Sequence, residues 1–208
     1  MQFLVTGFEP FGQSSINPSE QVVQRLATMQ FDDFTVATAV LPVHRRKGPE
    51  MLRTAVRQTQ PHAIICLGEA GGRQAISIER VAVNLLDYGI ADNEGALVQD
   101  EPIEPDGPAA YFTTLPVRQL MQAVRAVGIP AELSLTAGAY LCNQVTYELL
   151  HFLAQQQLNI PAGFVHLPFL PQQAAALPRN YPSMALETMS TAVSTLLHTL
   201  HGQRISGD

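Results

Sequence analysis

The chain has 208 residues and a formal net charge of −6, with 46% hydrophobic and 14% charged residues. That length suffices for a full hydrophobic core and the composition excludes a disordered chain, so we predict one domain over residues 1–208. The negative charge disfavours a nucleic-acid or anionic-membrane partner, because basic residues cluster only in the short run "HRRK" at 44–47. The first residues, "MQFLVTG", show no basic segment, long apolar stretch or cleavage site, so we expect a cytoplasmic protein without a membrane span.

Strand-like and helix-like segments alternate in chain order. After the first strand-like run, Asn17, Pro18 and Glu20 predict a helix start, with an asparagine cap, a proline in the first turn and a glutamate at the capping-box position. Further helices are predicted over 48–59, 116–127, 142–157 and 183–201. The strand-like runs are 2–7, 34–43, 62–68, 76–86, 131–136 and 162–168. This alternation predicts an α/β fold, in which a twisted, mostly parallel sheet carries helices on both faces.

The segment from 92 to 111, "DNEGALVQDEPIEPDGPAAY", interrupts the alternation. Its many Pro, Asp and Glu residues indicate a long irregular loop. Loops of that length in compact domains are usually functional or mobile. Two roles stay open for it, which are gating of a site and contact between subunits.

The loop "TGFEPFGQS" follows the first strand-like run, where sites of α/β proteins gather. Gly7 and Gly12 have the spacing of a phosphate-binding P-loop, but Gln13 stands where that loop needs lysine, so a nucleotide is not expected. Phe8 and Phe11 offer flat apolar faces that suit an uncharged ring. The alternative, that both rings simply fill the core, stays open.

The turn "TAGAY" leads Cys142 to the start of a predicted helix. Free N–H groups and the dipole of a helix start stabilise a thiolate, so we expect a lowered thiol pKa and a candidate nucleophile. The alternative is a buried structural cysteine, and this is our interpretation of Cys66 inside the apolar run "AIICLG". The two cysteines form no CxxC pair, so we expect no metal site.

A cysteine nucleophile needs a base, and histidine is the side chain suited to that task near neutral pH. Of the six histidines, His166 is the strongest candidate, because "GFVHLP" places it at the end of an apolar strand. Glu79 lies in the strand-like run "ISIERVAVN", where an unpaired carboxylate would be costly, so it is a candidate to orient the imidazole. The alternative for Glu79 is an ion pair with Arg73 or Arg80.

Taken together, these segments resemble the pyroglutamyl peptidase I family, also called pyrrolidone-carboxylate peptidases. The likeness covers nearly the whole chain, since "TGFEPFG", "GEAGGRQAISIERVAVN", "DNEG", "TAGAYLCN" and "GFVHLPFLPQQ" occur in the family's order. The resemblance implies a single-domain, phosphorylase/hydrolase-like α/β fold and a cysteine exopeptidase that removes N-terminal pyroglutamyl residues from peptides. It also implies a homotetramer that needs no cofactor and no metal.

The resemblance matches Glu79, Cys142 and His166 to the family's catalytic glutamate, cysteine and histidine. Cys142 would form an acyl-enzyme, His166 would protonate the leaving amine and then activate water, and Glu79 would fix the histidine tautomer. The residues implied to contact the lactam ring of the substrate are Phe8, Phe11, Glu69 and Leu141.

Two positions depart from the pattern of some bacterial members of that family. Glu69 stands where they carry glutamine near the lactam, and Gly89 stands where they carry arginine near the catalytic residues. A glutamate accepts a bond from the lactam N–H but cannot donate to its carbonyl, and the missing arginine removes one stabiliser of developing negative charge. Two alternatives therefore stay open: a weakly active or non-catalytic pyroglutamate-binding homologue, and a cysteine hydrolase of another cyclic amide.

Overall fold

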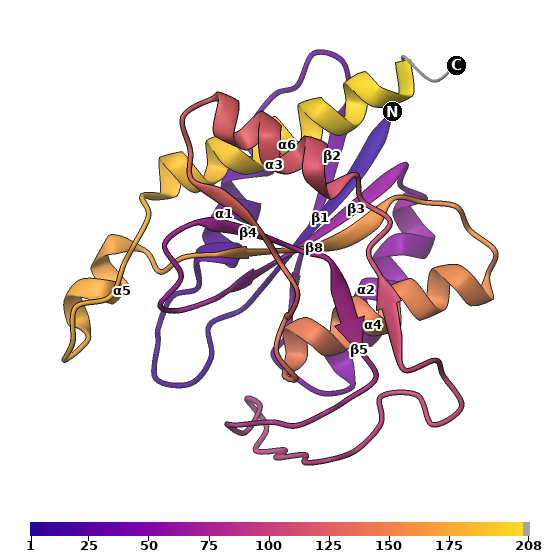
Figure 1. Ribbon diagram of the computed structural model, residues 1–208, viewed down its shortest axis with the longest axis vertical. Helices are drawn as coiled ribbons and strands as arrows, with labels where there is room; N and C mark the ends of the chain where they lie inside the picture. The colour runs from indigo at the N-terminus through magenta and orange to yellow at the C-terminus, as the bar shows by residue number, and fades with distance from the viewer. Residues whose placement is uncertain (206–208) are drawn as a thin grey trace.

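The computed structural model describes residues 1–205, and its centre is a six-stranded sheet (Figure 1). The strand order is β2-β1-β3-β8-β4-β7, where β2, β1, β3 and β8 are parallel and β4 runs antiparallel to β8 and parallel to β7. The predicted, mostly parallel sheet is therefore confirmed. In chain order the strands are β1 (Gln2–Phe8), β2 (Thr35–Leu41), β3 (Ala63–Glu69), β4 (Ile76–Glu79), β7 (Ala131–Ser134) and β8 (Ala162–Leu167).

Helices cover both faces of the sheet, as the alternation predicts. One face packs against α1, α3 and α6, and the other packs against α2 and α4 (Figure 1). Alternate residues of each central strand enter the two apolar clusters, because successive side chains of a strand point to opposite faces. The helices are α1 (Pro18–Leu26), α2 (Lys47–Thr59), α3 (Val117–Ala126), α4 (Leu141–Gln155), α5 (Pro171–Ala176) and α6 (Leu186–Ile205).

The predicted asparagine cap of the first helix is confirmed, and it also fixes the loop after β1. Asn17 Oδ1 accepts hydrogen bonds from the Ser19 backbone N–H at 2.9 Å and from its hydroxyl at 2.8 Å. Asn17 Nδ2 donates to the Glu9 carbonyl at 3.0 Å, and the Ser19 hydroxyl accepts from the Phe8 N–H at 2.9 Å. The start of α1 therefore holds the backbone on both sides of Phe8.

The run 76–86, predicted as one strand, is divided in the structure. After β4 the chain leaves the main sheet at Arg80, and β5 (Val81–Val83) pairs antiparallel with β6 (Ala110–Phe112) in a separate two-stranded sheet. The Asn143 side chain in α4 bonds both the N–H and the carbonyl of Val83 at 2.9 Å. This side-chain pairing draws β5 away from the central sheet and onto α4.

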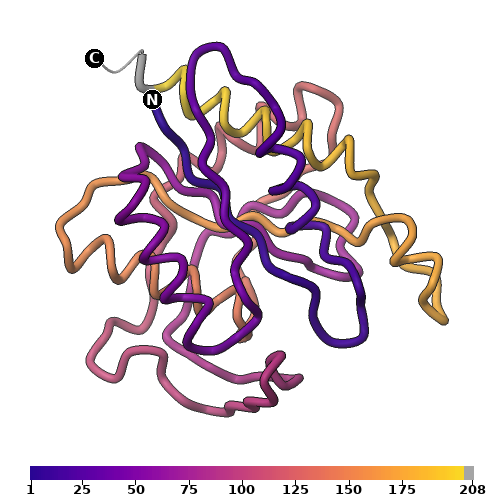
Figure 2. Tube along the Cα trace, turned by 180° about the vertical axis from the view of Figure 1, so that it is seen from behind, coloured from indigo at the N-terminus to yellow at the C-terminus, as the bar shows by residue number. Residues whose placement is uncertain are grey.

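The long loop predicted over 92–111 is confirmed for most of its length, although its last residues belong to β6. It lies at the end of the molecule toward which β5 runs (Figures 1 and 2). The short helix α5 is a further element that the sequence patterns do not predict. Among the described residues, no helix has the length and apolar character needed to cross a bilayer.

Candidate active site

The candidate base and orienter are neighbours in the sheet. Ser77 of β4 is the antiparallel partner of His166 in β8, and Glu79 lies two residues further along the same face. Side chains in this diagonal arrangement reach each other across an antiparallel pair. Glu79 Oε1 lies 2.8 Å from His166 Nδ1, and the two residues are only 1% and 4% exposed. The strand register thus brings together two residues that are 87 positions apart.

The charges of this pair are set by its burial. Burial lowers the pKa of the His166 imidazole and outweighs the opposing effect of the Glu79 carboxylate. Burial alone would raise the pKa of Glu79, but the hydrogen bond and charge of His166, together with Arg73, lower it overall. At neutral pH the pair is therefore a carboxylate beside a neutral imidazole. Its Nδ1–H donates to Glu79, so Nε2 is left as an acceptor.

Arg73 makes the ion pair that was the alternative interpretation of Glu79. Its Nη1 lies 2.6 Å from Glu79 Oε1, the oxygen that also accepts from His166. Its Nη2 donates to the Thr136 carbonyl at 3.0 Å, which ties this contact to the turn before α4. The two interpretations are therefore compatible, because one carboxylate oxygen serves both the arginine and the histidine.

Cys142 is half-buried in the first turn of α4, with its sulfur against β3. The preceding turn contains Gly138 at φ +78, a conformation that favours glycine. A β-carbon on Gly68 would lie 2.9 Å from Cys142 Sγ, so this close approach also needs glycine. Gly68 is the direct partner of His166 in the parallel pair of β3 and β8. The thiol and the imidazole therefore lie above neighbouring strands on the same face of the sheet.

The expected lowering of the Cys142 pKa is wrong for this structure. Burial raises the pKa of the thiol to about 12, and the carboxylates of Glu79 and Glu69 act in the same direction. Arg73 and the backbone N–H at the helix start act in the opposite direction but are outweighed. The resting cysteine is a neutral thiol, so its proton must leave during the reaction.

Alkylation of Cys142 by iodoacetamide is therefore expected to be slow at about pH 6 and to rise about tenfold per pH unit toward about pH 10. The sign follows from the raised pKa, because the reactive thiolate fraction grows with pH throughout the range below about 12. Peptide mass spectrometry would give the rate at Cys142, with glutathione as the free-thiol control. Fast labelling at about pH 6 with a plateau above it would instead show a resting thiolate.

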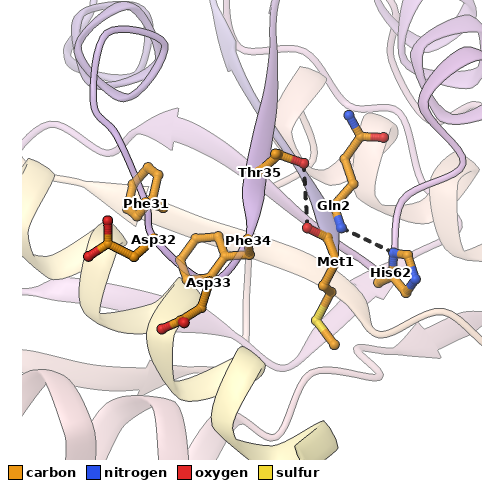
Figure 3. A pocket seen from close by; sticks show the side chains of 8 residues that line it. All are labelled: Met1, Gln2, Phe31, Asp32, Asp33, Phe34, Thr35 and His62. Carbon is orange, nitrogen blue, oxygen red and sulfur yellow. Dashed lines mark hydrogen bonds between the residues drawn. The ribbon is translucent and has the colours of Figure 1, made fainter.

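The other histidines have contacts of their own. His62 lies at the amino ends of β1 and β2, where its Nδ1 accepts a bond from the Gln2 N–H at 3.2 Å (Figure 3). His44 accepts from the Arg46 N–H at the start of α2. Those that contact aromatic rings are His151, His198 and His201. Of the histidines the structure describes, only His166 is the strand partner of Gly68, the residue against which the Cys142 sulfur lies.

A small cavity opens beside the sulfur, at the carboxyl ends of β1 and β3. The four residues predicted to contact the ring, Phe8, Phe11, Glu69 and Leu141, all line it together with Cys142. Phe8 also belongs to an apolar cluster, so it serves the core and the cavity at once. The lining residues that sequence reasoning missed are Asn17, Val43 and Tyr140. Tyr140 precedes the helix of Cys142 by one residue, which is a positional signal that could have found it.

The two departures differ in their surroundings. Glu69 Oε2 accepts a bond from Gln173 Nε2 at 2.7 Å, and burial raises the pKa of the Glu69 carboxyl despite this bond. Gly89 is exposed, and a β-carbon placed on it would meet no atom within 4 Å among the described residues. Glu69 is thus built into the cavity wall, whereas Gly89 leaves open space.

A thiol at a helix start, a buried imidazole and a buried carboxylate on one α/β sheet are the groups of a cysteine-type hydrolase. Comparison with known proteins agrees with this class. A family model described as pyroglutamyl peptidase matches residues 1–201. The chain belongs to the pyroglutamyl peptidase family.

Curated relatives match almost end to end. The pyrrolidone-carboxylate peptidase of Gloeobacter violaceus is 46% identical over 204 residues, which is 98% of each chain. That of Brevibacillus brevis is 41% identical over 94% of this chain and 91% of its own. The family resemblance read from the sequence is confirmed.

Solved structures confirm the fold. A mutant pyrrolidone carboxyl peptidase of Pyrococcus furiosus superposes with a TM-score of 0.94 at 41% identity, covering 98% of this chain and 99% of its own. Pyroglutamyl peptidase I of Bacillus amyloliquefaciens superposes with a TM-score of 0.92 at 37% identity, covering 96% and 94%. The single-domain α/β architecture is therefore that of the family.

Proposed function

We propose that this chain removes N-terminal pyroglutamyl residues from peptides, with Cys142 as nucleophile, His166 as acid and base, and Glu79 as orienter. The observation that carries the proposal is the 2.8 Å bond between His166 Nδ1 and Glu79 Oε1. It fixes the tautomer in which Nε2 can accept a proton. The thiol that would supply this proton lies above the neighbouring strand, against Gly68.

The first half-reaction forms a thioester. As Cys142 Sγ attacks the pyroglutamyl carbonyl carbon, its proton passes to His166 Nε2, because a thiol with a pKa of about 12 does not ionise beforehand. The negative charge of Glu79 stabilises the imidazolium that results. The C–N bond then breaks and His166 returns the proton to the leaving amine.

The second half-reaction releases pyroglutamate. His166 takes a proton from water, the resulting hydroxide attacks the thioester carbon, and the C–S bond breaks. The proton then returns to Cys142 Sγ, which restores the starting state. Each step moves one proton between Nε2 and a reacting atom, so the chain's own side chains supply the acid and base chemistry.

The start of α4 offers stabilisation for the oxyanion. Tyr140, at the cap position, makes no side-chain capping bond to any described residue, so the N–H groups of the first turn remain available. These donors and the helix dipole favour negative charge near Cys142. These backbone donors can stabilise the developing negative charge without the arginine that some family members carry at the position of Gly89.

The cavity suits a lactam ring. Phe8 and Phe11 supply flat apolar walls, and Glu69 can accept a bond from the ring N–H. A lactam carries no ammonium charge, whereas a free amino terminus would have to be desolvated to enter among apolar side chains. Specificity for a cyclised N-terminus follows from this cost.

We also propose that the protein forms a homotetramer and is located in the cytoplasm. Phe112 of β6 is 70% exposed and Val83 of β5 is 37% exposed. Both lie on the outer face of the two-stranded sheet, opposite Ala82 and Tyr111. An apolar face of this kind supports association with further copies of the chain.

A pyroglutamyl-amide reporter is expected to be cleaved with a kcat/KM about 100-fold or more above that of a prolyl-amide, since the prolyl ring brings a charged ammonium and lacks the lactam carbonyl. A glutaminyl-amide, with its free amine, is the matched open-chain control. Binding of pyroglutamate without turnover would instead show a non-catalytic binder. Equal cleavage of all three amides would contradict a pocket selective for the lactam.

A further inference from the structure

The turn Asp92–Gly95, which is the "DNEG" motif, contacts the loop after β1 through one side chain. Asn93 Nδ2 lies 2.9 Å from Glu9 Oε1 and 2.9 Å from the Pro10 carbonyl. The amide group has two N–H donors, so it can satisfy both acceptors at once. Asn93 is exposed and does not line the cavity. Its bonds therefore act on the cavity wall from outside.

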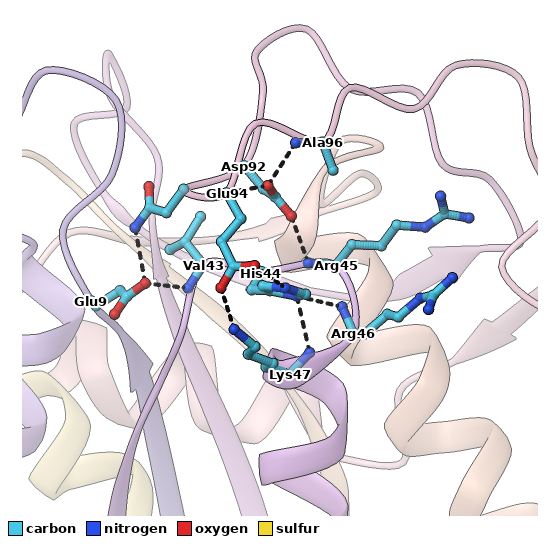
Figure 4. Close-up of polar contacts among 10 residues, drawn as sticks. Glu9, Val43, His44, Arg45, Arg46, Lys47, Asp92, Glu94 and Ala96 are labelled. Atoms are coloured by element: carbon cyan, nitrogen blue, oxygen red, sulfur yellow. Dashed lines mark hydrogen bonds and ion pairs between the residues drawn. The ribbon is translucent and has the colours of Figure 1, made fainter.

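The turn itself is fixed to the start of α2. Asp92 is 5% exposed, and its carboxylate accepts the backbone N–H groups of Arg45, Glu94 and Ala96 at 2.9 to 3.0 Å (Figure 4). Burial raises the pKa of Asp92, but these three bonds outweigh burial and lower it overall. The carboxylate stays ionised and keeps its three hydrogen bonds. These bonds fix the backbone of the turn and therefore the position of Asn93.

A second contact holds the same turn. Glu94 lies 3.1 Å from His44 Nε2 and also pairs with Lys47 (Figure 4). The other ring nitrogen of His44 accepts the N–H groups of Arg46 at 2.9 Å and Lys47 at 3.2 Å, so it caps the start of α2. This arrangement places the ring proton on Nε2, where it donates to Glu94.

Three parts of the cavity wall are bonded to this turn or to residue 91, just before it. Glu9 and Pro10 connect the two wall residues Phe8 and Phe11, and they carry both acceptors of Asn93. The Asn93 backbone N–H donates to the Val43 carbonyl at 3.0 Å, and the Val43 backbone N–H donates to Glu9 Oε1 at 2.9 Å. The Tyr140 hydroxyl donates to the carbonyl of residue 91 at 3.2 Å. Wall residues from three parts of the chain are therefore bonded, directly or through Glu9 and Pro10, to the short segment 91–93, which lies outside the cavity.

We propose that Asn93 is a specificity-determining positioning residue, whose side-chain amide holds Glu9 and Pro10 and thereby sets the spacing of Phe8 and Phe11 around the ring. This inference rests on the proposed function, because it takes the cavity as the place where the lactam binds. It assigns the "DNEG" turn to ring recognition, whereas the transfer of protons at Cys142 and His166 does not depend on it.

The test is the kinetics of Asn93→Ala on the pyroglutamyl-amide reporter. KM is expected to rise about tenfold with kcat changed by less than about threefold, because ring binding is weakened while the reacting groups stay in place. The rate of Cys142 alkylation and the melting temperature should stay near the parental values. Asn159→Ala, which removes another exposed asparagine, is the matched control and should keep parental kinetics.

Exchange of donor and acceptor separates this contact from a general loosening of the loop. Asn93→Asp faces the Glu9 carboxylate with a like charge, so KM should rise at least as much as in Asn93→Ala. In the double variant Asn93→Asp with Glu9→Gln, the glutamine amide can donate to the new aspartate. KM should then fall back toward the parental value.

Binding of free 2-pyrrolidone, measured by its protection of Cys142 from alkylation, gives a readout that does not need turnover. Weaker protection in Asn93→Ala than in the parent would support the inference. Parental KM and protection in Asn93→Ala would overturn the role of Asn93 and leave the proposed function standing. A parent that neither cleaves the reporter nor binds 2-pyrrolidone would overturn both.

Discussion

Replacement of Cys142 by serine is expected to abolish hydrolysis of the pyroglutamyl-amide reporter, with kcat/KM reduced about 1,000-fold or more. A serine hydroxyl ionises far less readily than a thiol. The neutral His166 imidazole, whose pKa burial has lowered, is a poor base for removing its proton. The variant should fold normally, because the residue is only half-buried and the substitution is small. Reporter kinetics and circular dichroism on the same sample would check both parts.

Cys66→Ser is the matched control for this experiment. Cys66 is fully buried in β3, where its partner in β1 is Thr6, and burial raises the pKa of its thiol to about 12. The raised pKa is thus common to both cysteines, and their positions relative to the cavity and to His166 distinguish them. Most activity should survive this substitution. Equal losses in the two variants would mean that Cys142 is a packing residue and not the nucleophile.

The elements that the sequence predicts well are those with one unbroken local pattern. The helix predicted over 183–201 has an apolar stripe of Leu186, Met189, Val193, Leu196 and Leu200. All five side chains join one cluster on α6, the last four buried and Leu186 partly buried. The run 76–86 also has an unbroken strand-like pattern, but it divides at Arg80. Alternation of side chains does not record which sheet a strand joins. Here the choice is made by Asn143, whose side chain bonds Val83 from a distant part of the chain.

For the candidate site, too, the sequence identifies the residues, whereas their contacts and burial depend on the tertiary fold. Residue types and strand ends single out Cys142, His166 and Glu79, and the structure brings Glu79 and His166 into direct contact. The predicted lowering of the Cys142 pKa is wrong. A helix start is visible in the sequence, but the burial of the thiol and the neighbouring carboxylates that raise its pKa are not. The sequence likewise presents an ion pair with Arg73 and a catalytic role as alternatives for Glu79. It cannot show that one carboxylate oxygen serves both Arg73 and His166, because that contact depends on the register of distant strands.

Glu79→Gln is expected to lower kcat by about two to four orders of magnitude, with a smaller change in KM. Glutamine keeps the size of the side chain but can turn its amide N–H toward His166 Nδ1. The ring proton then moves to Nε2, which can no longer accept the proton of Cys142. The imidazolium formed during the reaction also loses its stabilising charge, so the pKa of His166 falls further. Glu79→Asp keeps the charge, so its kcat should fall less than that of Glu79→Gln.

The control for Glu79 is Arg73→Gln, which removes the ion pair and leaves the bond to His166. If Glu79 acted only through that ion pair, the two glutamine variants would lose similar thermal stability and would both hydrolyse the reporter at nearly parental rates once folded. If Glu79 orients His166, kcat in Glu79→Gln falls far more than in Arg73→Gln. Hydrolysis of the reporter by each variant is to be measured below its melting transition. A parental kcat in Glu79→Gln would contradict the triad, while the pairing of Cys142 with His166 would stand.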